Sequence, residues 1–276
     1  MYYSPKVSII MGAYNCDNIV SKSIESVINQ SYDNWELIIC DDASTDNTYE
    51  VINNYAKLDS RIKLIRNETN KRLAQSLNNC LEIASGKYVA RIDADDYYTD
   101  DKLKVQVKYM EENPELDVTG TGRYLYNDEE GDYAIEKPIE KPNKNTLLTG
   151  SPFAHPTIMM KKEVYDSIGR YTVSKATMRC EDLDLWFKFY EKGYIGKNIQ
   201  EPLLHYHLCE YDYKKRTIKA AIGTSKIMYS GFKRIGVPWY KYILIIRPIL
   251  SSIVPHKLLY KYHRSKYKNI KLRFKK

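Results

Sequence analysis

The sequence predicts an α/β protein built on a mostly parallel sheet with helices on both faces. Two observations lead to this prediction. Short apolar runs alternate with helical patterns along the first hundred residues, and polar clusters at 12–15, 41–42 and 93–96 directly follow three of the runs. Strand–helix repeats of this length specify a parallel sheet, and such sheets bind ligands at the carboxyl ends of their strands. We therefore expect one binding site along that edge.

The strands expected in the first half are short and apolar, as buried parallel strands are. They comprise residues 7–11, 35–40, 61–66 and 88–92. Between them lie segments with apolar residues at helical spacing. The first covers residues 17–28 and is expected to be capped by Asp17. The second passes through 51–55, after the polar turn 43–48, and the third covers 71–84. Neither GxGxxG nor a P-loop motif is present, which argues against dinucleotide and P-loop sites.

The second half is expected to begin with a helix over 99–112 and a strand over 116–126. Residues 127–145 are polar and carry two prolines. We expect them to form a loop, either a mobile cover over the site or a plain surface insertion. A further helix follows in 178–191, with an apolar stripe at helical spacing. The stripe consists of Leu183, Trp186, Phe187 and Tyr190.

Three carboxylates, Asp93, Asp95 and Asp96, follow the buried strand 88–92. Carboxylates repel one another and are costly to desolvate, so apolar strands do not normally end in a cluster of them. A divalent cation such as Mg²⁺ or Mn²⁺ would remove this cost and could neutralise a diphosphate. Asp42 could accept a hydrogen bond from a nucleotide base. The alternative for the cluster is a solvated turn that caps the next helix.

A second acidic group, Glu181, Asp182 and Asp184, crowds the start of the helix in 178–191. The helix dipole favours acidic residues in a first turn. A carboxylate at a buried helix start can also serve as a general base, if desolvation raises its pKa towards working pH. The strand over 203–209 places His205 and His207 on one face, where they either complete a metal site or line a pocket.

Charge divides the chain into an acidic body and a basic tail. The 276 residues carry a net charge of +8, yet residues 213–276 hold 18 Lys and Arg and no Asp or Glu. We expect domains at 1–212, with halves of about 1–98 and 99–212, and at 213–276, a helical extension. Its apolar run 240–254 falls short of the roughly 20 residues that span a bilayer.

An amphipathic element on an anionic membrane accounts best for this tail. Nucleic-acid binding is the less favoured alternative, and docking on the acidic body or in a homodimer stays open. The five cysteines are odd in number and lack a CxxC, so neither a disulfide framework nor a zinc site is expected. Free thiols fit a reducing cytosol, and the chain begins without a signal-peptide pattern.

Taken in order, these clusters resemble the family 2 glycosyltransferases, which have the GT-A fold. The matching pieces are VSIIMGAYN at 7–15, CDDASTDNT at 40–48, GKYVARIDADD at 86–96, HPTIMMKKEVYDSIGRY at 155–171, EDLDLW at 181–186 and NIQEPLLHYH at 198–207. A DxD alone is unspecific, whereas this ordered set over about 200 residues is highly specific.

The resemblance implies a metal-dependent transfer of a sugar, with inversion, from a nucleoside diphosphate donor, most readily a UDP-sugar. On the matching positions, Ala13, Tyr14 and Asp42 would hold the nucleobase and ribose, with Arg72 near the donor. Asp93 and Asp95 would bind the ribose and the diphosphate-bound cation, and Asp96 would lie close to the donor sugar. Asp182 would be the general base, supported by Glu181.

Two departures from the family pattern bear on these roles. Many relatives read Tyr-Arg-x-His after the last strand, where this chain has Tyr206-His207-Leu208-Cys209. If that histidine is a metal ligand, it is missing, and His207 would substitute for it. The absence of QxxRW argues against a processive polysaccharide synthase.

The sequence thus predicts an inverting glycosyltransferase of cell-surface polysaccharide synthesis. It would act on a glycan or lipid-linked acceptor, at the cytoplasmic face of the plasma membrane. The alternative is a catalytically silent relative that binds nucleotide or scaffolds partners there. Donor sugar, acceptor linkage and oligomeric state are not predictable from the sequence.

Overall fold

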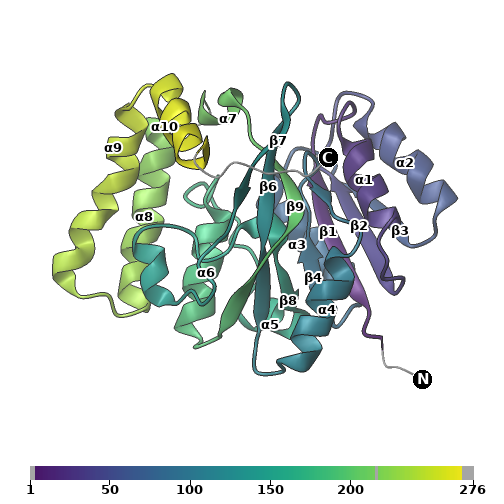
Figure 1. Cartoon of the computed structure of the whole chain (residues 1–276), viewed down its shortest axis with the longest axis horizontal. Coiled ribbons are helices and arrows are strands. Elements are labelled where there is room, and N and C mark those ends of the chain that lie inside the picture. Colours follow the sequence, from purple (N-terminus) through teal and green to yellow (C-terminus); the bar gives the residue numbers. More distant parts are fainter. Residues whose placement is uncertain (1–3, 215–216, 269–276) are drawn as a thin grey trace.

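The computed structural model describes residues 4–214 and 217–268, which form a mixed sheet flanked by helices (Figure 1). Basic residues of the predicted tail at 215–216 and 269–276 lie outside the described residues. The strands are β1 Val7–Ala13, β2 Trp35–Asp41, β3 Ile62–Arg66, β4 Tyr88–Arg91, β5 Tyr97–Tyr98, β6 Val118–Asn127, β7 Gly131–Glu136, β8 Met159–Lys161 and β9 Gly196–His207. The helices are α1 Val20–Ile28, α2 Thr48–Leu58, α3 Leu73–Ile83, α4 Lys102–Glu112, α5 Lys162–Ser167, α6 Glu181–Glu191, α7 Glu210–Lys214, α8 Ile218–Arg234, α9 Arg247–Ile253 and α10 His256–Lys268. Short 3₁₀ helices are η1 Lys144–Leu148, η2 His155–Thr157 and η3 Trp239–Ile246.

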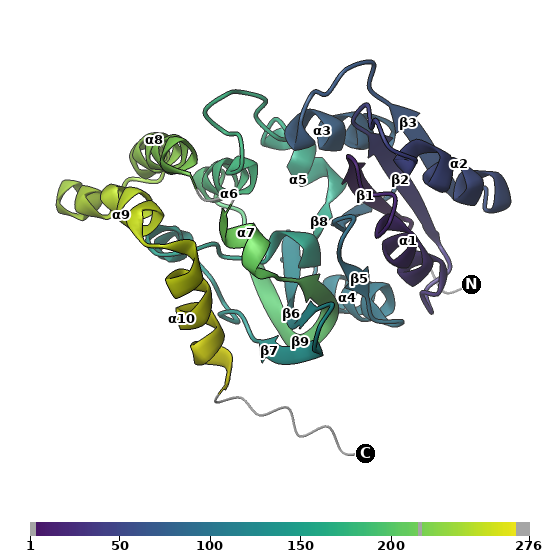
Figure 2. The ribbon, with the colours of Figure 1, turned by 90° about the horizontal axis from the view of Figure 1, so that it is seen from above.

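The first half is a parallel sheet in the order β3-β2-β1-β4, as the strand–helix alternation predicts. Val7 pairs with Trp35 on one side and Tyr88 on the other, so the three strands share one register. Side chains alternate between two cores. Ile10 and Val89 belong to the core under α3, α5 and α6, while Ile9 and Ala90 belong to the core under α1, α2 and α4 (Figure 2).

The second half adds strands in both directions, so the sheet is mixed as predicted. β8 is antiparallel to β4 and to β6, and β9 is parallel to β6. The expectation of a loop over 127–145 is wrong in part. Gly131–Glu136 forms β7, an edge strand antiparallel to β6, and Gly131 makes the tight turn with a positive φ of 67°. Short polar edge strands carry little hydrophobic signal, which explains the error.

The predicted cap of the first helix is also wrong. α1 begins at Val20 after Ile19, and no side chain caps it. Asp17 instead accepts a hydrogen bond from the Asn47 backbone N–H at 3.4 Å, ahead of α2. Its carboxylate therefore joins two neighbouring strand–helix connections of the sheet rather than starting its own helix.

The C-terminal helices extend the fold on the side away from α1 and α2 (Figure 1). α8 packs against α6, where Phe232 meets the ring of Phe187 and Arg234 pairs with Asp184 at 2.7 Å. A Cβ on Gly231 would lie 2.3 Å from the Phe187 ring, so only glycine allows this close approach. α8 thus shares a hydrophobic core with α6. The division at residue 212 stays a prediction based on charge.

Glu36 is a buried carboxylate at the start of β2, and its contribution to the stability of the fold can be tested by mutation. It accepts hydrogen bonds from Ser8 Oγ at 2.6 Å, Lys63 Nζ at 2.7 Å and the Ser85 N–H at 2.8 Å. Burial alone would raise the pKa of Glu36, but these hydrogen bonds outweigh it and hold the pKa well below its usual range. We expect Glu36→Gln to lower the free energy of unfolding at pH 7 by about 2 kcal/mol.

Because a depressed pKa stabilises the fold only above the group's ordinary pKa, this difference should shrink below about pH 4.5. Urea unfolding at pH 7 and pH 4 measures it. Glu115→Gln, at an exposed position between α4 and β6, is the control and should leave unfolding unchanged. A difference between Glu36→Gln and wild type that stays constant with pH would contradict the assignment.

Candidate active site

The ends of β1 and β2 bring the predicted nucleotide residues together. Ala13 and Asp41 are register partners at the carboxyl ends of the two strands. The Asp42 N–H donates to the Ala13 carbonyl at 2.8 Å, and Tyr14 follows with a half-exposed ring. The structure therefore places Ala13, Tyr14 and Asp42 side by side at one sheet edge.

Asp42 also organises the segment that leads into α3. Its Oδ1 accepts hydrogen bonds from Asn67 Nδ2 and the Lys71 N–H, both at 2.7 Å, and its Oδ2 accepts one from the Arg72 N–H at 2.8 Å. Arg72 has a positive φ of 74°, a conformation that needs support in a residue with a side chain. Asp42 thus positions Arg72 at the same edge. Its contact with a base remains a prediction.

The three aspartates after β4 form one oxygen cluster. One carboxylate oxygen from each of Asp93, Asp95 and Asp96 lies within 4.8 Å of the others. Burial raises the pKa of Asp95 to about 6, and repulsion by Asp93 adds to the effect. Asp96 is fully enclosed, and burial followed by repulsion from its neighbours raises its pKa well above the usual range.

This cluster has the chemistry of a divalent-cation site. Oδ1 of Asp96 accepts the His207 N–H at 2.9 Å, while its buried Oδ2 has no hydrogen-bond partner among the described residues. Hard oxygen donors in this number suit Mg²⁺ or Mn²⁺. A cation would also relieve the repulsion that raises the pKa values of Asp95 and Asp96. The residues present therefore fit such an ion.

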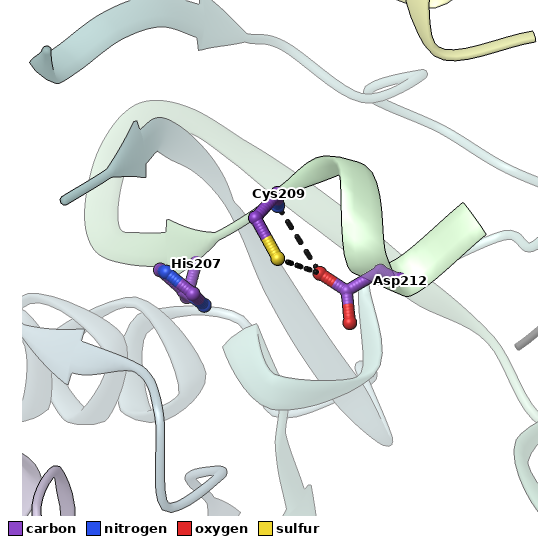
Figure 3. A group of neighbouring side chains, drawn as sticks. All are labelled: His207, Cys209 and Asp212. Atoms are coloured by element: carbon purple, nitrogen blue, oxygen red, sulfur yellow. Dashed lines mark hydrogen bonds between the residues drawn. The ribbon is translucent and has the colours of Figure 1, made fainter. Parts of the chain in front are cut away.

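A second group of metal-ligating side chains lies at the end of β9 (Figure 3). His207, Cys209 and Asp212 each offer an atom within 4.8 Å of the others. Asp212 Oδ2 accepts hydrogen bonds from the Cys209 N–H at 3.1 Å and its Sγ at 3.4 Å. Because His207 also donates its N–H to Asp96, this group adjoins the aspartate cluster. The sequence named His207 as a metal ligand but missed Cys209 and Asp212.

His205 takes no part in that group. Its ring stacks on Tyr97 with 4.1 Å between centroids, and its Nδ1 lies 2.8 Å from Asp132 on β7. His207 instead faces Asp128 at the turn between β6 and β7, with 3.4 Å between Nε2 and Oδ2. The hairpin that replaces the expected loop therefore reaches the edge of the site.

The predicted base and its neighbour begin α6. Asp182 Oδ1 accepts the N–H of Leu183 at 2.8 Å, which fixes the carboxylate at the helix start. Burial raises the pKa of Asp182, and the positive charge of Arg91 opposes this. Burial also raises the pKa of Glu181, with repulsion by Asp182 adding to it. A buried carboxylate with a raised pKa can take up a proton during a reaction.

Arg91, the last residue of β4, lies in the electrostatic field of both acidic groups. Its side chain is buried, and its Nη2 pairs with Asp93 Oδ1 at 2.8 Å. Burial alone would lower the pKa of Arg91, but attraction by Asp93 and by the carboxylates of Glu181 and Asp182 outweighs it. Sequence reasoning missed this residue. An arginine inside the run YVARI was the available signal, because a buried strand rarely carries an unpaired charge.

Comparison with known proteins gives the family. The sequence profile of "Glycosyl transferase family 2" matches residues 8–169. The chain is 40% identical over 272 residues to the putative glycosyltransferase EpsE of Bacillus subtilis, covering 98% of each chain. It is 29% identical over 260 residues to the Escherichia coli protein WfaP, covering 94% of this chain and 98% of that one. WfaP is described as a UDP-Glc:alpha-D-GlcNAc-diphosphoundecaprenol beta-1,3-glucosyltransferase.

Solved structures share the fold. Staphylococcus aureus TarS 1–349 in complex with UDP superposes with a TM-score of 0.63 and 19% identity, over 96% of this chain and 88% of that chain. The mannosyltransferase PcManGT of Pyrobaculum calidifontis, in complex with GDP-Man and Mn²⁺, superposes with a TM-score of 0.64 and 17% identity, over 96% of this chain and 81% of that chain. The family profile, the extent of identity with EpsE and these superpositions together establish that the chain belongs to glycosyl transferase family 2 and is a glycosyltransferase with the GT-A fold.

Proposed function

We propose that this glycosyltransferase moves a sugar, with inversion, from a UDP-sugar to a hydroxyl of a lipid-diphosphate-linked glycan in cell-surface polysaccharide synthesis. One observation carries the proposal. The buried Arg91 pairs with Asp93 of the cluster after β4 and also attracts the carboxylates of Glu181 and Asp182, which begin α6. The chain thus holds a group suited to a metal-bound diphosphate beside a group suited to proton abstraction. The descriptions of WfaP and of the TarS complex support the UDP donor, and that of WfaP supports the acceptor class.

The proposed reaction divides these residues into two sides. Asp182 takes the proton of the acceptor hydroxyl while the oxygen of that hydroxyl forms a bond to the anomeric carbon. The bond between that carbon and the diphosphate oxygen breaks, and UDP leaves with the electron pair. Asp95, with Asp93 and His207, would hold a divalent cation, which supplies charge stabilisation for the leaving diphosphate. Glu181 holds its negative charge beside Asp182 and thereby favours proton uptake there.

Inversion requires the base and the leaving group on opposite faces of the donor sugar. Asp93 forms an ion pair with Arg91. Asp182, at the start of a different element, α6, is attracted by the charge of Arg91, which opposes the rise that burial causes in the pKa of Asp182. This arrangement supports placement of the sugar between the two groups. Ala13, Tyr14, Asp42 and Arg72 would then hold the nucleoside along the β1–β2 edge.

The decisive experiment tests donor use before any acceptor is known. Isothermal titration with UDP is performed with Mn²⁺ and with EDTA, followed by hydrolysis assays on a panel of UDP-sugars. We expect metal-dependent UDP binding and slow hydrolysis of one UDP-sugar. If UDP binds without hydrolysis of any sugar, even with lipid-linked acceptors present, the catalytically silent alternative is favoured. If UDP, GDP, CMP and dTDP all fail to bind, the donor site is refuted.

We further propose that the C-terminal extension places the enzyme on the anionic inner surface of the plasma membrane. Apolar side chains of η3 and α9 face outward, among them Trp239 at 84%, Ile243 at 70% and Ile253 at 66% exposure. The extension carries Lys and Arg without any acidic residue. Among the described residues no single helix is long and apolar enough to cross a membrane, although the bent pair Trp239–Ile253 and His256–Ser265 meets the length and composition criteria. Surface binding agrees with both facts.

We expect the protein to sediment with phosphatidylglycerol vesicles and much less with phosphatidylcholine vesicles. The double substitution Ile243→Asp with Ile253→Asp should abolish sedimentation, because it places charge on the inserted face. Leu58→Asp is the matched control, since Leu58 is 86% exposed at the end of α2 and lies outside the extension. If the double variant sediments as well as Leu58→Asp, the membrane face is wrongly assigned.

A further inference from the structure

A groove between α6, α8 and α9 opens beside the proposed base. Its first part has a volume of about 380 Å³ and is lined by both Asp182 and residues of the C-terminal extension. The neighbouring pocket shares Arg179, Thr224, Pro248 and Ser251 with it, so the two pockets lie side by side, and we treat them together as the groove. The second pocket reaches Asp212, a member of the group at the end of β9. The groove thus runs from one side of the proposed site to the other.

The walls of this groove combine apolar surface with positive charge. Leu148, Leu183 and Met228 form apolar wall near Asp182, and Arg179 and Arg247 bring two guanidinium groups. Arg247 has no ion pair in the described part of the chain, whereas Arg234, on the neighbouring α8, is paired with Asp184. An arginine without a carboxylate partner, beside hydroxyl groups in a depression, is suited to bind a phosphate group.

The two faces of α9 set the orientation of this groove. Pro248, Ser251 and Ser252 line it, and Leu250 and Ile253 lie on the exposed side of the helix. A helix in water normally buries its apolar side and exposes its hydroxyl groups. The reversed order in α9 places the polar groove directly behind the surface that we assign to the membrane.

We propose that this groove binds the diphosphate and the first lipid segment of the acceptor, with Arg247 and Arg179 on the diphosphate. The inference rests on the proposed function and names the acceptor subsite of the same reaction. A sugar linked to a lipid diphosphate has its anionic group one sugar ring away from the hydroxyl that reacts. With that hydroxyl at Asp182, the diphosphate falls along the groove and the lipid leaves it over α9 towards the bilayer.

The test compares two probes that differ only in the diphosphate. These are N-acetylglucosaminyl diphosphoundecane and undecyl N-acetylglucosaminide, titrated against the full chain in neutral detergent micelles. We expect the wild type to bind the diphosphate probe more tightly. Arg247→Gln should weaken that binding about tenfold or more, as expected for loss of a charged hydrogen bond, and leave the undecyl glycoside unaffected. Arg247→Lys, which keeps the charge, should retain most of the affinity.

Two controls separate the possible failures. Lys226→Gln removes a positive charge from an exposed position of α8 outside the groove and should bind both probes like the wild type. UDP titration with Mn²⁺ on every variant reports whether the donor site is intact. If the wild type binds both probes equally, or if Arg247→Gln and Lys226→Gln behave alike, the groove assignment is overturned. If the diphosphate probe binds through Arg247 while UDP does not bind at all, the groove assignment stands and the proposed donor site fails.

Discussion

Asp182→Asn is expected to lower kcat for sugar transfer by roughly 10²–10⁴-fold, the range of general base assistance. Its affinity for UDP with Mn²⁺ should stay at the wild-type value. The physical reason is that, in the proposed reaction, Asp182 meets the acceptor hydroxyl and not the nucleotide. Asparagine preserves the shape of the side chain and can still accept the Leu183 N–H, so the helix start is retained. Steady-state kinetics with a lipid-linked acceptor, together with UDP titration, separate the two effects.

Asp184 provides the matched control on the same helix turn. Its carboxylate turns away from the site and accepts hydrogen bonds from Arg234 Nη2 at 2.7 Å and Thr172 Oγ1 at 2.5 Å. Asp184→Asn breaks a buried ion pair and should lower the free energy of unfolding by about 3 kcal/mol. At a temperature where it stays folded, it should keep its turnover. Asp182→Asn should show the opposite pattern. If Asp182→Asn transfers sugar at the wild-type rate, Asp182 is not the base.

The substitution Glu181→Gln, compared with Asp182→Asn, shows whether Glu181 supports the base or is itself the base. Repulsion by Asp182 adds to the raised pKa of Glu181, and this repulsion between the two charges is mutual. Glu181→Gln therefore removes part of the attraction for a proton during transfer. A loss of turnover smaller than that of Asp182→Asn would agree with support, and a larger loss would exchange the two roles.

Much of the donor edge was predictable because it follows from local patterns. Apolar runs that end in Gly12, Asp41 and Asp93 specify where parallel strands stop, and parallel strands bring their ends together regardless of the loops between them. The pairing of Ala13 with Asp41 is the outcome. The roles expected for Asp182 and Glu181 came from the resemblance to the family, because spacing alone favoured the helix dipole as the explanation of this acidic group.

Other parts depend on contacts between distant segments and left little trace in the sequence. Arg91 attracts the carboxylates of Glu181 and Asp182, although these residues stand about 90 positions further along the chain. The contact between Cys209 and Asp212 is local instead, since the two residues are three positions apart at the start of α7. The outward apolar side of α9 was hidden as well. The run ILIIRPIL shows that this segment is hydrophobic, but it does not show which face of α9 packs against α8.

Asp95→Asn is expected to remove the metal dependence of UDP binding and to lower kcat/KM by about 10²-fold or more, since a cation supplies several kcal/mol of transition-state stabilisation. Arg91 already neutralises Asp93, and the His207 N–H holds one oxygen of Asp96. Asp95 therefore carries the charge that is most available to an ion. UDP titration with Mn²⁺ and with EDTA measures the effect, and the two isotherms of the variant should coincide.

The same substitution should stabilise the metal-free protein, which distinguishes a lost ligand from a damaged fold. Burial raises the pKa of Asp95 to about 6, so at pH 7 its charge opposes folding when no cation is bound, and a neutral amide removes this cost. In EDTA, Asp95→Asn should unfold at a higher urea concentration than the wild type. Asp100→Asn, at an exposed position five residues further on, should change neither stability nor UDP binding. An Asp95→Asn protein that still binds UDP more tightly with Mn²⁺ would assign the cation to His207, Cys209 and Asp212 instead, the one other group of potential metal ligands found among the described residues.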